Sequence, residues 1–203
     1  MTLWGRSSER RGTPTDFLVL GLGNPGAEYA RSRHNVGFDV VDELARRRGV
    51  SLGKSRLSAT VAETTFAEQR IVLACPTTYM NLSGEAAVAL LRRYGVGEAQ
   101  QIIVVQDELD LEPGIVRVKV GGGLAGHNGL RSLTQHLHTQ DYLRVRIGVG
   151  KPPSKASGAN HVLKKIPKAE RELLDVAVQV AADAVESIVS IGVGLTMTAF
   201  NGR

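Results

Sequence analysis

The sequence predicts an α/β fold, a three-layer α/β/α sandwich around a mixed, largely parallel central sheet. Short apolar segments typical of buried strands alternate with longer segments whose apolar residues recur at helical spacing. The run from Ile102 to Val105 is continuously β-branched or apolar, which indicates a strand covered on both faces. A sheet with such strands needs helices on each side, so three layers are expected.

Five elements are expected before residue 100. An apolar strand leads through a glycine-rich loop into an amphipathic helix, and a hairpin of two strands leads through a second loop into another helix. In order, these elements are a strand at Phe17–Leu20, a helix from about Val36 to Arg48, strands at Arg56–Thr65 and Arg70–Ala74, and a helix from about Leu82 to Tyr94 that ends at Gly95.

The second half of the chain continues the alternation. After the buried strand come a strand at Ile115–Val120, a glycine loop at Gly121–Gly123, a helix at Gly129–His138 and a strand at Tyr142–Val149. Lys151–Asn160 is rich in Pro, Ser, Lys and Gly and predicts a mobile loop. A long amphipathic helix follows Pro167, with its apolar stripe marked by Leu173, Val176, Val180, Ala184 and Ile188.

The totals indicate one soluble domain. The chain has 203 residues, 42% hydrophobic and 22% charged, which is enough for one well-packed core and short for two. We expect a single domain over residues 17–203, preceded by a disordered extension over residues 1–16 that lacks the apolar core of a secretion signal. No apolar stretch approaches the ~20 residues of a membrane span. These features favour a cytoplasmic monomer without a membrane or obligate protein partner.

The basic composition favours a polyanionic partner. The net charge of +5 is weak evidence alone, but cations gather around two predicted strands and the loop after them. These cations are Arg117, Lys119, Arg144, Arg146, Lys151 and Lys155. We expect them to share one surface suited to nucleic acid.

The segment Gly21–Gly26 fits the spacing of a dinucleotide-binding turn, but its context does not. In such a site a helix begins within the motif, whereas here the helical pattern starts only at Val36, after a polar insert. The acidic residue expected about 20 residues later is also replaced, by Arg46, Arg47 and Arg48. A nucleotide-dependent oxidoreductase is therefore disfavoured.

Polar side chains follow several predicted strands and are expected to converge at the carboxyl ends of the sheet. His34 is the candidate general base, and Asp107 the carboxylate that orients it and stabilises its protonated form. A histidine that merely bonds a neighbour and a surface carboxylate are the structural alternatives. Uncharged side chains around them suit the binding of a peptide and of an ester oxygen that gains charge.

The asparagines among these side chains also have a structural interpretation. Asn24 precedes Pro-Gly and can start a turn, while Asn81 and Asn128 precede helices and are good N-caps. From the residues alone, both interpretations of the asparagines stay open.

Other catalytic schemes fit less well. Ser83 lacks the G-x-S-x-G turn of a hydrolase serine, and the single cysteine, Cys75, excludes a disulfide or a cysteine-clustered zinc site. His136 and His138 are two residues apart on a helix and face different ways. We therefore expect no metal and no cofactor.

Four long motifs closely resemble those of the bacterial peptidyl-tRNA hydrolase family. They are Gly-Leu-Gly-Asn-Pro-Gly through Ser-Arg-His-Asn at Gly21–Asn35, Pro-Thr-Thr-Tyr-Met-Asn-Leu-Ser-Gly at Pro76–Gly84, Asp-Glu-Leu-Asp-Leu at Asp107–Leu111, and Gly-Gly-Gly-x-x-Gly-His-Asn-Gly-Leu-Arg at Gly121–Arg131. The resemblance runs from about Phe17 to near the C-terminus. It implies an esterase that releases a stalled peptide from the 3′ end of tRNA without metal or cofactor.

The same resemblance implies roles for matching positions. His34 resembles the proton acceptor, Asp107 its partner, and Asn24 the residue that separates blocked from unblocked aminoacyl-tRNA. The implied contacts to the peptide and the tRNA end are Tyr29, Tyr79, Met80, Asn81, His127 and Asn128. Lys119 and Arg146 match a clamp on the 5′ phosphate of tRNA, which is blind to sequence. A non-catalytic RNA-binding relative of the same fold, similar to plastid splicing factors, remains the alternative.

Overall fold

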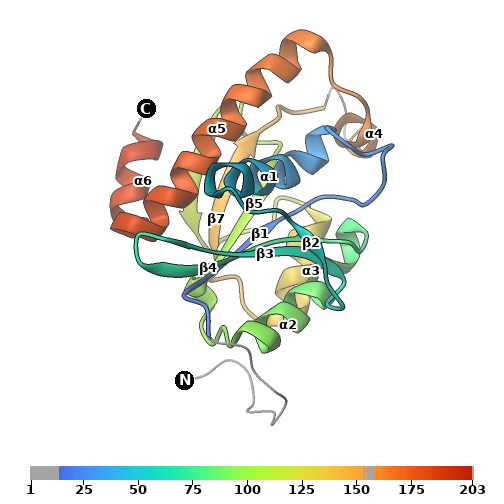
Figure 1. The fold of residues 1–203 in the computed structure, drawn as a ribbon. Coiled ribbons are helices and arrows are strands. Elements are labelled where there is room, and N and C mark those ends of the chain that lie inside the picture. Colours follow the sequence, from blue (N-terminus) through green and yellow to red (C-terminus); the bar gives the residue numbers. More distant parts are fainter. Residues whose placement is uncertain (1–13, 153, 155–157, 203) are drawn as a thin grey trace.

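The computed structural model describes residues 14–152, 154 and 158–202. Within them, seven strands form one sheet in the order β2-β3-β4-β1-β5-β7-β6 (Figure 1). The four central strands β4, β1, β5 and β7 run parallel, and the remaining strands pair antiparallel at the two edges. The predicted fold class, a mixed and largely parallel sheet between helices, is confirmed.

The predicted strands and helices are present in the predicted order, and β2, α4 and α6 are additional to them. The strands are β1 (Phe17–Gly21), β2 (Gly53–Lys54), β3 (Ala59–Phe66), β4 (Gln69–Pro76), β5 (Ile102–Glu108), β6 (Val116–Val120) and β7 (Leu143–Gly148). The helices are α1 (Val36–Arg48), α2 (Ser83–Tyr94), α3 (Asn128–Leu137), α4 (Gly158–Leu163), α5 (Lys168–Ile191) and α6 (Val193–Asn201). Short 3-10 turns precede three of these elements: η1 (Arg33–Asn35), η2 (Met80–Leu82) and η3 (Ala99–Gln101).

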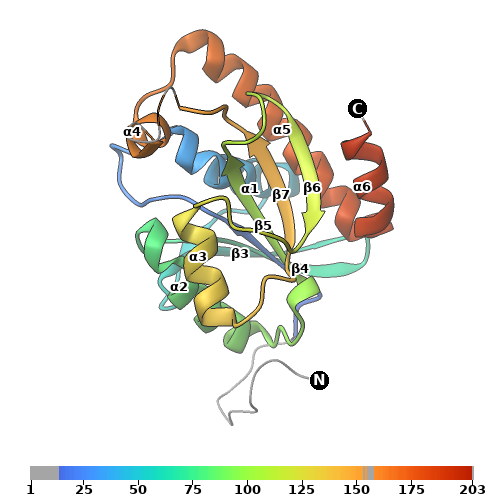
Figure 2. The same cartoon turned by 180° about the vertical axis from the view of Figure 1, so that it is seen from behind.

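The helices cover the sheet in two layers, as Figures 1 and 2 show from opposite sides. The helices α1 and α5 pack on one face around a core that includes Val19, Val105 and Val145. The helices α2 and α3 pack on the other, around Leu20 and Val104. Alternate residues of the same strand thus enter different cores, and β1 and β5 are covered on both faces.

The glycine motif serves the packing of α1 against β1. A Cβ at Gly21 would lie 2.4 Å from the carbonyl oxygen of Gly37, and one at Gly37 would lie 2.5 Å from that of Val105. The helix can approach the strands this closely only because both positions lack a side chain. The chain from Leu22 to Ser32 lies outside any helix, so α1 begins well after the motif, as predicted.

The predicted apolar stripe of α5 is wrong for its first two residues and confirmed for the rest, since Ala184 and Ile188 are buried and Val180 is partly buried against the core. Leu173 and Val176 are 55% and 63% exposed, whereas Leu174, Ala177 and Val178 are buried. Small residues allow α5 to lie close to the sheet and to α1, and this close packing overrides the pattern of large side chains.

The last two arginines of α1 pair with acids on α5. Arg47 lies 2.7 Å from Asp183 and Arg48 lies 2.5 Å from Glu186. Their role in the fold is thus to tie two helices together on one layer.

The described chain is ordered before Phe17, the residue at which we expected the domain to begin. Thr15 donates from its hydroxyl to the carbonyl of Arg70 at 2.7 Å, and its backbone N–H donates to the carbonyl of Tyr94 at 3.0 Å. Residues 1–13 of the expected extension lie outside the described residues. The helix α4 also begins inside the segment predicted as a loop, at Gly158. No helix among the described residues is long and apolar enough to cross a membrane.

Candidate active site

The parallel strands bring the predicted polar side chains to one edge of the sheet. Asn24 follows β1, Tyr79 and Asn81 follow β4, and Asp107 lies near the carboxyl end of β5. Because β4, β1 and β5 are adjacent and parallel, these ends meet at the same edge. The turn η1, at the end of the polar insert, brings His34 back to this edge.

Asp107 lies between two histidines. Its Oδ1 accepts from Nδ1 of His34 at 2.8 Å and from Nε2 of His127 at 3.1 Å. The Asp107 side chain is only 2% exposed and that of His34 is 12% exposed. The predicted pair of base and carboxylate is therefore formed, and a second imidazole joins it.

Asp107 and His34 have shifted pKa values, because both are largely buried and carry opposite charges when ionised. Burial alone lowers the pKa of His34, but the charge and hydrogen bond of Asp107 outweigh it and hold the pKa above its usual value. For Asp107, burial acts in the opposite direction and raises the pKa. The charges and hydrogen bonds of His34 and His127 outweigh burial, so that the pKa of Asp107 lies well below its usual range. Asp107 is thus an anion that keeps the proton of His34 on Nδ1 and leaves Nε2 as the basic atom.

The orientation of His127 is fixed by the start of α3. Its Nδ1 accepts from the backbone N–H groups of Gly129 and Leu130, at 3.1 and 3.3 Å. The ring proton must then sit on Nε2, which donates it to Asp107. Three side chains of metal-binding type do gather here, His34, Asp107 and His127, but a protonated Nε2 is a donor and not a ligand.

Asn24 is held by hydrogen bonds from two other segments. Its Oδ1 accepts from the backbone N–H of Met80 at 2.9 Å, and its own backbone bonds the side chain of Asn35 in both directions, at 2.9 and 2.8 Å. Among the described residues Nδ2 of Asn24 has no partner, and the side chain lines a cavity. The amide is therefore fixed with a donor to offer.

Two adjoining cavities meet at His34 and together form a cleft. The first, about 490 Å³, is lined by the predicted contact residues Asn24, Tyr29, Tyr79, Met80, Asn81 and Asn128, together with His34, Val162 and Leu163. The second, about 680 Å³, includes Asp107, His127 and Lys151 and shares His34, Asn128 and Val162 with the first. The structure thus brings all the predicted catalytic and peptide-contact residues to one cleft.

The asparagines at the helix starts are not the N-caps there. Leu82 occupies the N-cap position of α2, and the N-cap of α3 is His127, whose side chain makes the capping bonds. Asn81 and Asn128 are both exposed and line the first cavity. The capping alternative is wrong for both.

The predicted basic surface is formed in part. Lys119 of β6 and Arg146 of β7 are diagonal neighbours on one face of the sheet, since Lys119 pairs with Arg144 and Arg117 with Arg146. Nη1 of Arg146 lies 3.5 Å from Oε2 of Glu108, a residue that lines the second cavity. Lys155 lies outside the described residues.

Arg144 is not a surface residue, contrary to prediction. It is 1% exposed, and its guanidinium donates to the carbonyls of Gly122 and Gly123, at 2.6 and 2.8 Å. The guanidinium also lies over the ring of Tyr142, 4.9 Å from its centroid. Arg144 therefore holds the glycine loop that leads to His127 and is unavailable to a ligand.

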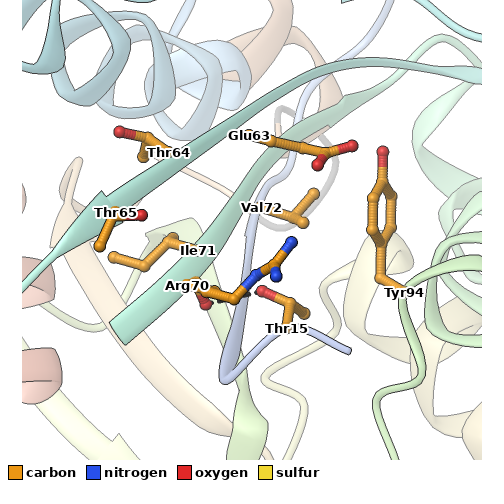
Figure 3. Close-up of a pocket in the computed structure, with 8 residues that line it drawn as sticks. All are labelled: Thr15, Glu63, Thr64, Thr65, Arg70, Ile71, Val72 and Tyr94. Atoms are coloured by element: carbon orange, nitrogen blue, oxygen red, sulfur yellow. Dashed lines mark hydrogen bonds between the residues drawn. The ribbon is translucent and has the colours of Figure 1, made fainter. Parts of the chain in front are cut away.

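A separate cavity of about 260 Å³ lies toward the amino ends of the same strands (Figure 3). Arg70, Glu63 and Tyr94 point into it, but Arg70 and Glu63 are exposed. Burial and the neighbouring carboxylate of Glu63 raise the pKa of Tyr94. This cavity has a cation and an acid but no pair of base and carboxylate, so the carboxyl-end cleft is the better candidate.

Comparison with known proteins places the chain in a family. The model of the peptidyl-tRNA hydrolase family matches residues 18–203. The chain belongs to the peptidyl-tRNA hydrolase family. A peptidyl-tRNA hydrolase of Rhodococcus erythropolis is 49% identical over 176 residues, which cover 86% of this chain and 92% of the relative. One of Anaeromyxobacter dehalogenans is 46% identical, covering 92% and 96%.

A solved structure agrees with the family assignment. The crystal structure of peptidyl-tRNA hydrolase from Acinetobacter baumannii superposes with a TM-score of 0.88 at 37% identity, covering 95% of this chain and 98% of that one. The fold and the predicted family are thereby confirmed.

Three side chains in or beside the cleft have contacts that the sequence did not reveal. His127 was expected as a substrate contact, and its bond to Asp107 was not foreseen; Arg33 and Asn35 belong to the first family motif but were given no role. The available signal was position, since each lies beside a predicted site residue at the start of a helix or turn.

Proposed function

We propose that this chain hydrolyses the ester bond between a peptide and the 3′ end of tRNA, releasing both. Membership of the family and the sequence identity to peptidyl-tRNA hydrolases support this activity. The observation that carries the mechanism is the His34–Asp107 pair, which leaves Nε2 of His34 as a base at the junction of the two cavities.

In the proposed mechanism His34 acts on a water molecule. Nε2 takes a proton from the water as its oxygen attacks the ester carbonyl, and Asp107 stabilises the imidazolium that forms. The tetrahedral intermediate then collapses, the bond to the ribose oxygen breaks, and the proton passes from Nε2 to that oxygen. The products are a free carboxylic acid and a tRNA with its hydroxyl restored.

The neutral amides are proposed to bind the peptide. Asn24, with its Oδ1 held by Met80, has Nδ2 available for a substrate carbonyl. Asn81 and Asn128 line the same cavity, and Tyr29 and Tyr79 add aromatic surface. Amides suit this site because they bond to a carbonyl without placing a competing charge beside His34.

His127 is proposed to position Asp107 and not to bind the substrate. Its Nε2 donates to the carboxylate, and its Nδ1 is already occupied by two backbone N–H groups. A fixed carboxylate in turn fixes the imidazole of His34.

Lys119 and Arg146 are proposed to bind a phosphate of the tRNA. Both residues lie on the same face of the sheet. Arg146 contacts Glu108, which lines the second cavity, so the proposed phosphate site lies next to the cleft. We further propose that the chain acts as a monomer in the cytoplasm, because one chain supplies the whole cleft and the substrate arises in translation.

The decisive experiment is incubation with an N-blocked aminoacyl-tRNA. We expect release of the blocked amino acid, and much slower release from the same aminoacyl-tRNA without the block, because we propose that Asn24 recognises the blocked group. Binding of tRNA without hydrolysis would contradict the proposal and favour the non-catalytic RNA-binding alternative.

A further inference from the structure

Arg33 directly precedes the candidate base, yet it faces away from the cleft. Its side chain is only 9% exposed. It makes a two-bond contact with Glu170 in the first turn of α5, with Nε–Oε1 and Nη2–Oε2 distances of 2.5 Å. A paired, planar contact of this kind fixes direction as well as distance.

The same guanidinium reaches α4. Its Nη1 donates to the backbone carbonyl of His161 at 2.8 Å. The ring of His161 in turn bonds through Nε2 to the carbonyls of Val149 and Gly150, both at 3.1 Å, just after β7. Helix α4 is therefore held on one side by the end of the sheet and on the other by the turn that carries His34. Figures 1 and 2 both show α4 beside the segment that precedes α1.

Helix α4 forms an apolar wall of the cleft. Val162 lines both cavities, and Leu163 lines the one that contains Asn24 and Tyr79. A helix of six residues has little stability of its own, so its place must come from its contacts. The contacts of Arg33 are thus suited to set the distance between this wall and His34.

We propose that Arg33, with Glu170 and the carbonyl of His161, is a positioning unit that sets the width of the cleft for the peptide part of the substrate. Arg33 touches neither the substrate nor the reacting atoms. The two other residues of η1 are oriented by separate contacts: His34 by Asp107, and Asn35 by the backbone of Asn24. This proposal rests on the proposed hydrolysis and adds what controls the fit of the peptide.

The chain offers a matched control. Arg31 lies in the same insert and also bonds a carboxylate of α5, Asp175, at 3.0 Å. That pair is exposed, with side-chain exposures of 61% and 48%, and among the described residues Arg31 makes no hydrogen bond to α4. Arg31→Gln removes the same charge from the same segment without touching the wall.

The test measures kcat and KM for N-blocked aminoacyl-tRNA and for a tRNA carrying a longer peptide. For Arg33→Gln we expect KM to rise about tenfold and more for the longer peptide, while kcat changes less than about threefold, because binding is lost and the base is kept. The pH at which kcat/KM reaches half its maximum should not move. Arg31→Gln should match the wild type in all these values.

Two outcomes would overturn the proposal. A folded Arg33→Gln enzyme with wild-type KM for both substrates would show that the contacts do not set the cleft. A fall in kcat with unchanged KM and a shifted pH profile would mean that Arg33 positions the base His34 and not the wall formed by α4. Should Arg33→Gln not fold, Glu170→Gln leaves the arginine in place and is judged by the same values. Absence of turnover in the wild type would instead refute the hydrolysis itself.

Discussion

The two ends of the sheet each carry a polar cavity, and they differ in how their charges are held. At the amino end, Glu63 and Arg70 are exposed side chains on neighbouring strands of a hairpin. At the carboxyl end, Asp107 is 3% exposed and shared by two imidazoles. Water screens the charges at the amino end. At the carboxyl end the charges interact at low dielectric, so that the pKa of His34 is raised and that of Asp107 is lowered.

The comparison shows that a polar lining alone does not mark a reactive site. Both cavities contain an acid and a group that can carry positive charge, and the difference lies in convergence and burial. Only the carboxyl end combines adjacent parallel strands, a buried anion and a base whose free nitrogen faces a cleft. Because of this difference, substitutions at the two ends should have very different effects on hydrolysis.

The largest effect is expected for His34→Ala. Loss of the general base should lower kcat by about 10²- to 10⁴-fold, while binding of tRNA is retained. Release of an N-blocked amino acid from tRNA measures the rate, and a filter-binding assay measures affinity. His138→Asn is the control, because His138 is exposed and has the left-handed backbone that asparagine tolerates. A His34→Ala enzyme with near-normal kcat would remove the basis for preferring the carboxyl end.

The next effect concerns the pH dependence and Asp107. Hydrolysis needs neutral His34, whose pKa is raised, so the acid limb of kcat/KM should have its midpoint above the usual histidine value of about 6.5. Asp107→Asn removes the charge that raises the pKa and leaves the burial that lowers it. We expect a lower kcat and a midpoint displaced toward acid. A midpoint that stays in place would mean that Asp107 does not control the titration of His34.

Much of the site at the carboxyl end of the sheet could be predicted from the sequence, because its residues are placed by the points at which the strands end. Continuous apolar runs located β1 and β5, and the residues after them, Asn24 and Asp107, had to lie near one another once those strands were parallel. The bounds of α1 were also predicted closely, since its apolar spacing is regular and Gly49 ends it in a left-handed conformation.

What could not be predicted depends on contacts between distant segments. The bond of His127 to Asp107 requires the path of the glycine loop, which includes positive φ at Gly121, Gly122, Ala125 and Gly126 and which buried Arg144 helps to hold. No local pattern encodes that path. Similarly, the alanines that α5 buries give a weaker hydrophobic signal than the exposed Leu173 and Val176. The strand β2 has two residues, both exposed, and too little pattern to detect.

A moderate effect is expected for the proposed phosphate clamp. Lys119→Glu and Arg146→Glu should each raise KM about tenfold with little change in kcat, because a phosphate contact far from the ester contributes equally to ground state and transition state. Each variant should also reduce the slope of log affinity against log salt by about one. Lys54→Glu makes the same charge change at the other edge of the sheet and should alter neither value. A fall in kcat alone would contradict the clamp.

The smallest effect on catalysis is expected at the amino end. Tyr94 is 5% exposed, and its hydroxyl faces the carboxylate of Glu63 (Figure 3), so Tyr94→Phe removes one polar contact and leaves the ring in the core. The free energy of unfolding should fall by about 1 kcal/mol, the net value of one hydrogen bond. Values of kcat and KM should stay within about twofold of the wild type, because the cavity lies at the end of the strands away from His34. Urea unfolding and the hydrolysis assay measure the two quantities on the same preparation. A tenfold change in kcat/KM from this variant, with stability intact, would mean that the two ends are coupled through the strands between them. The contrast between a reactive and an inert end would then no longer hold.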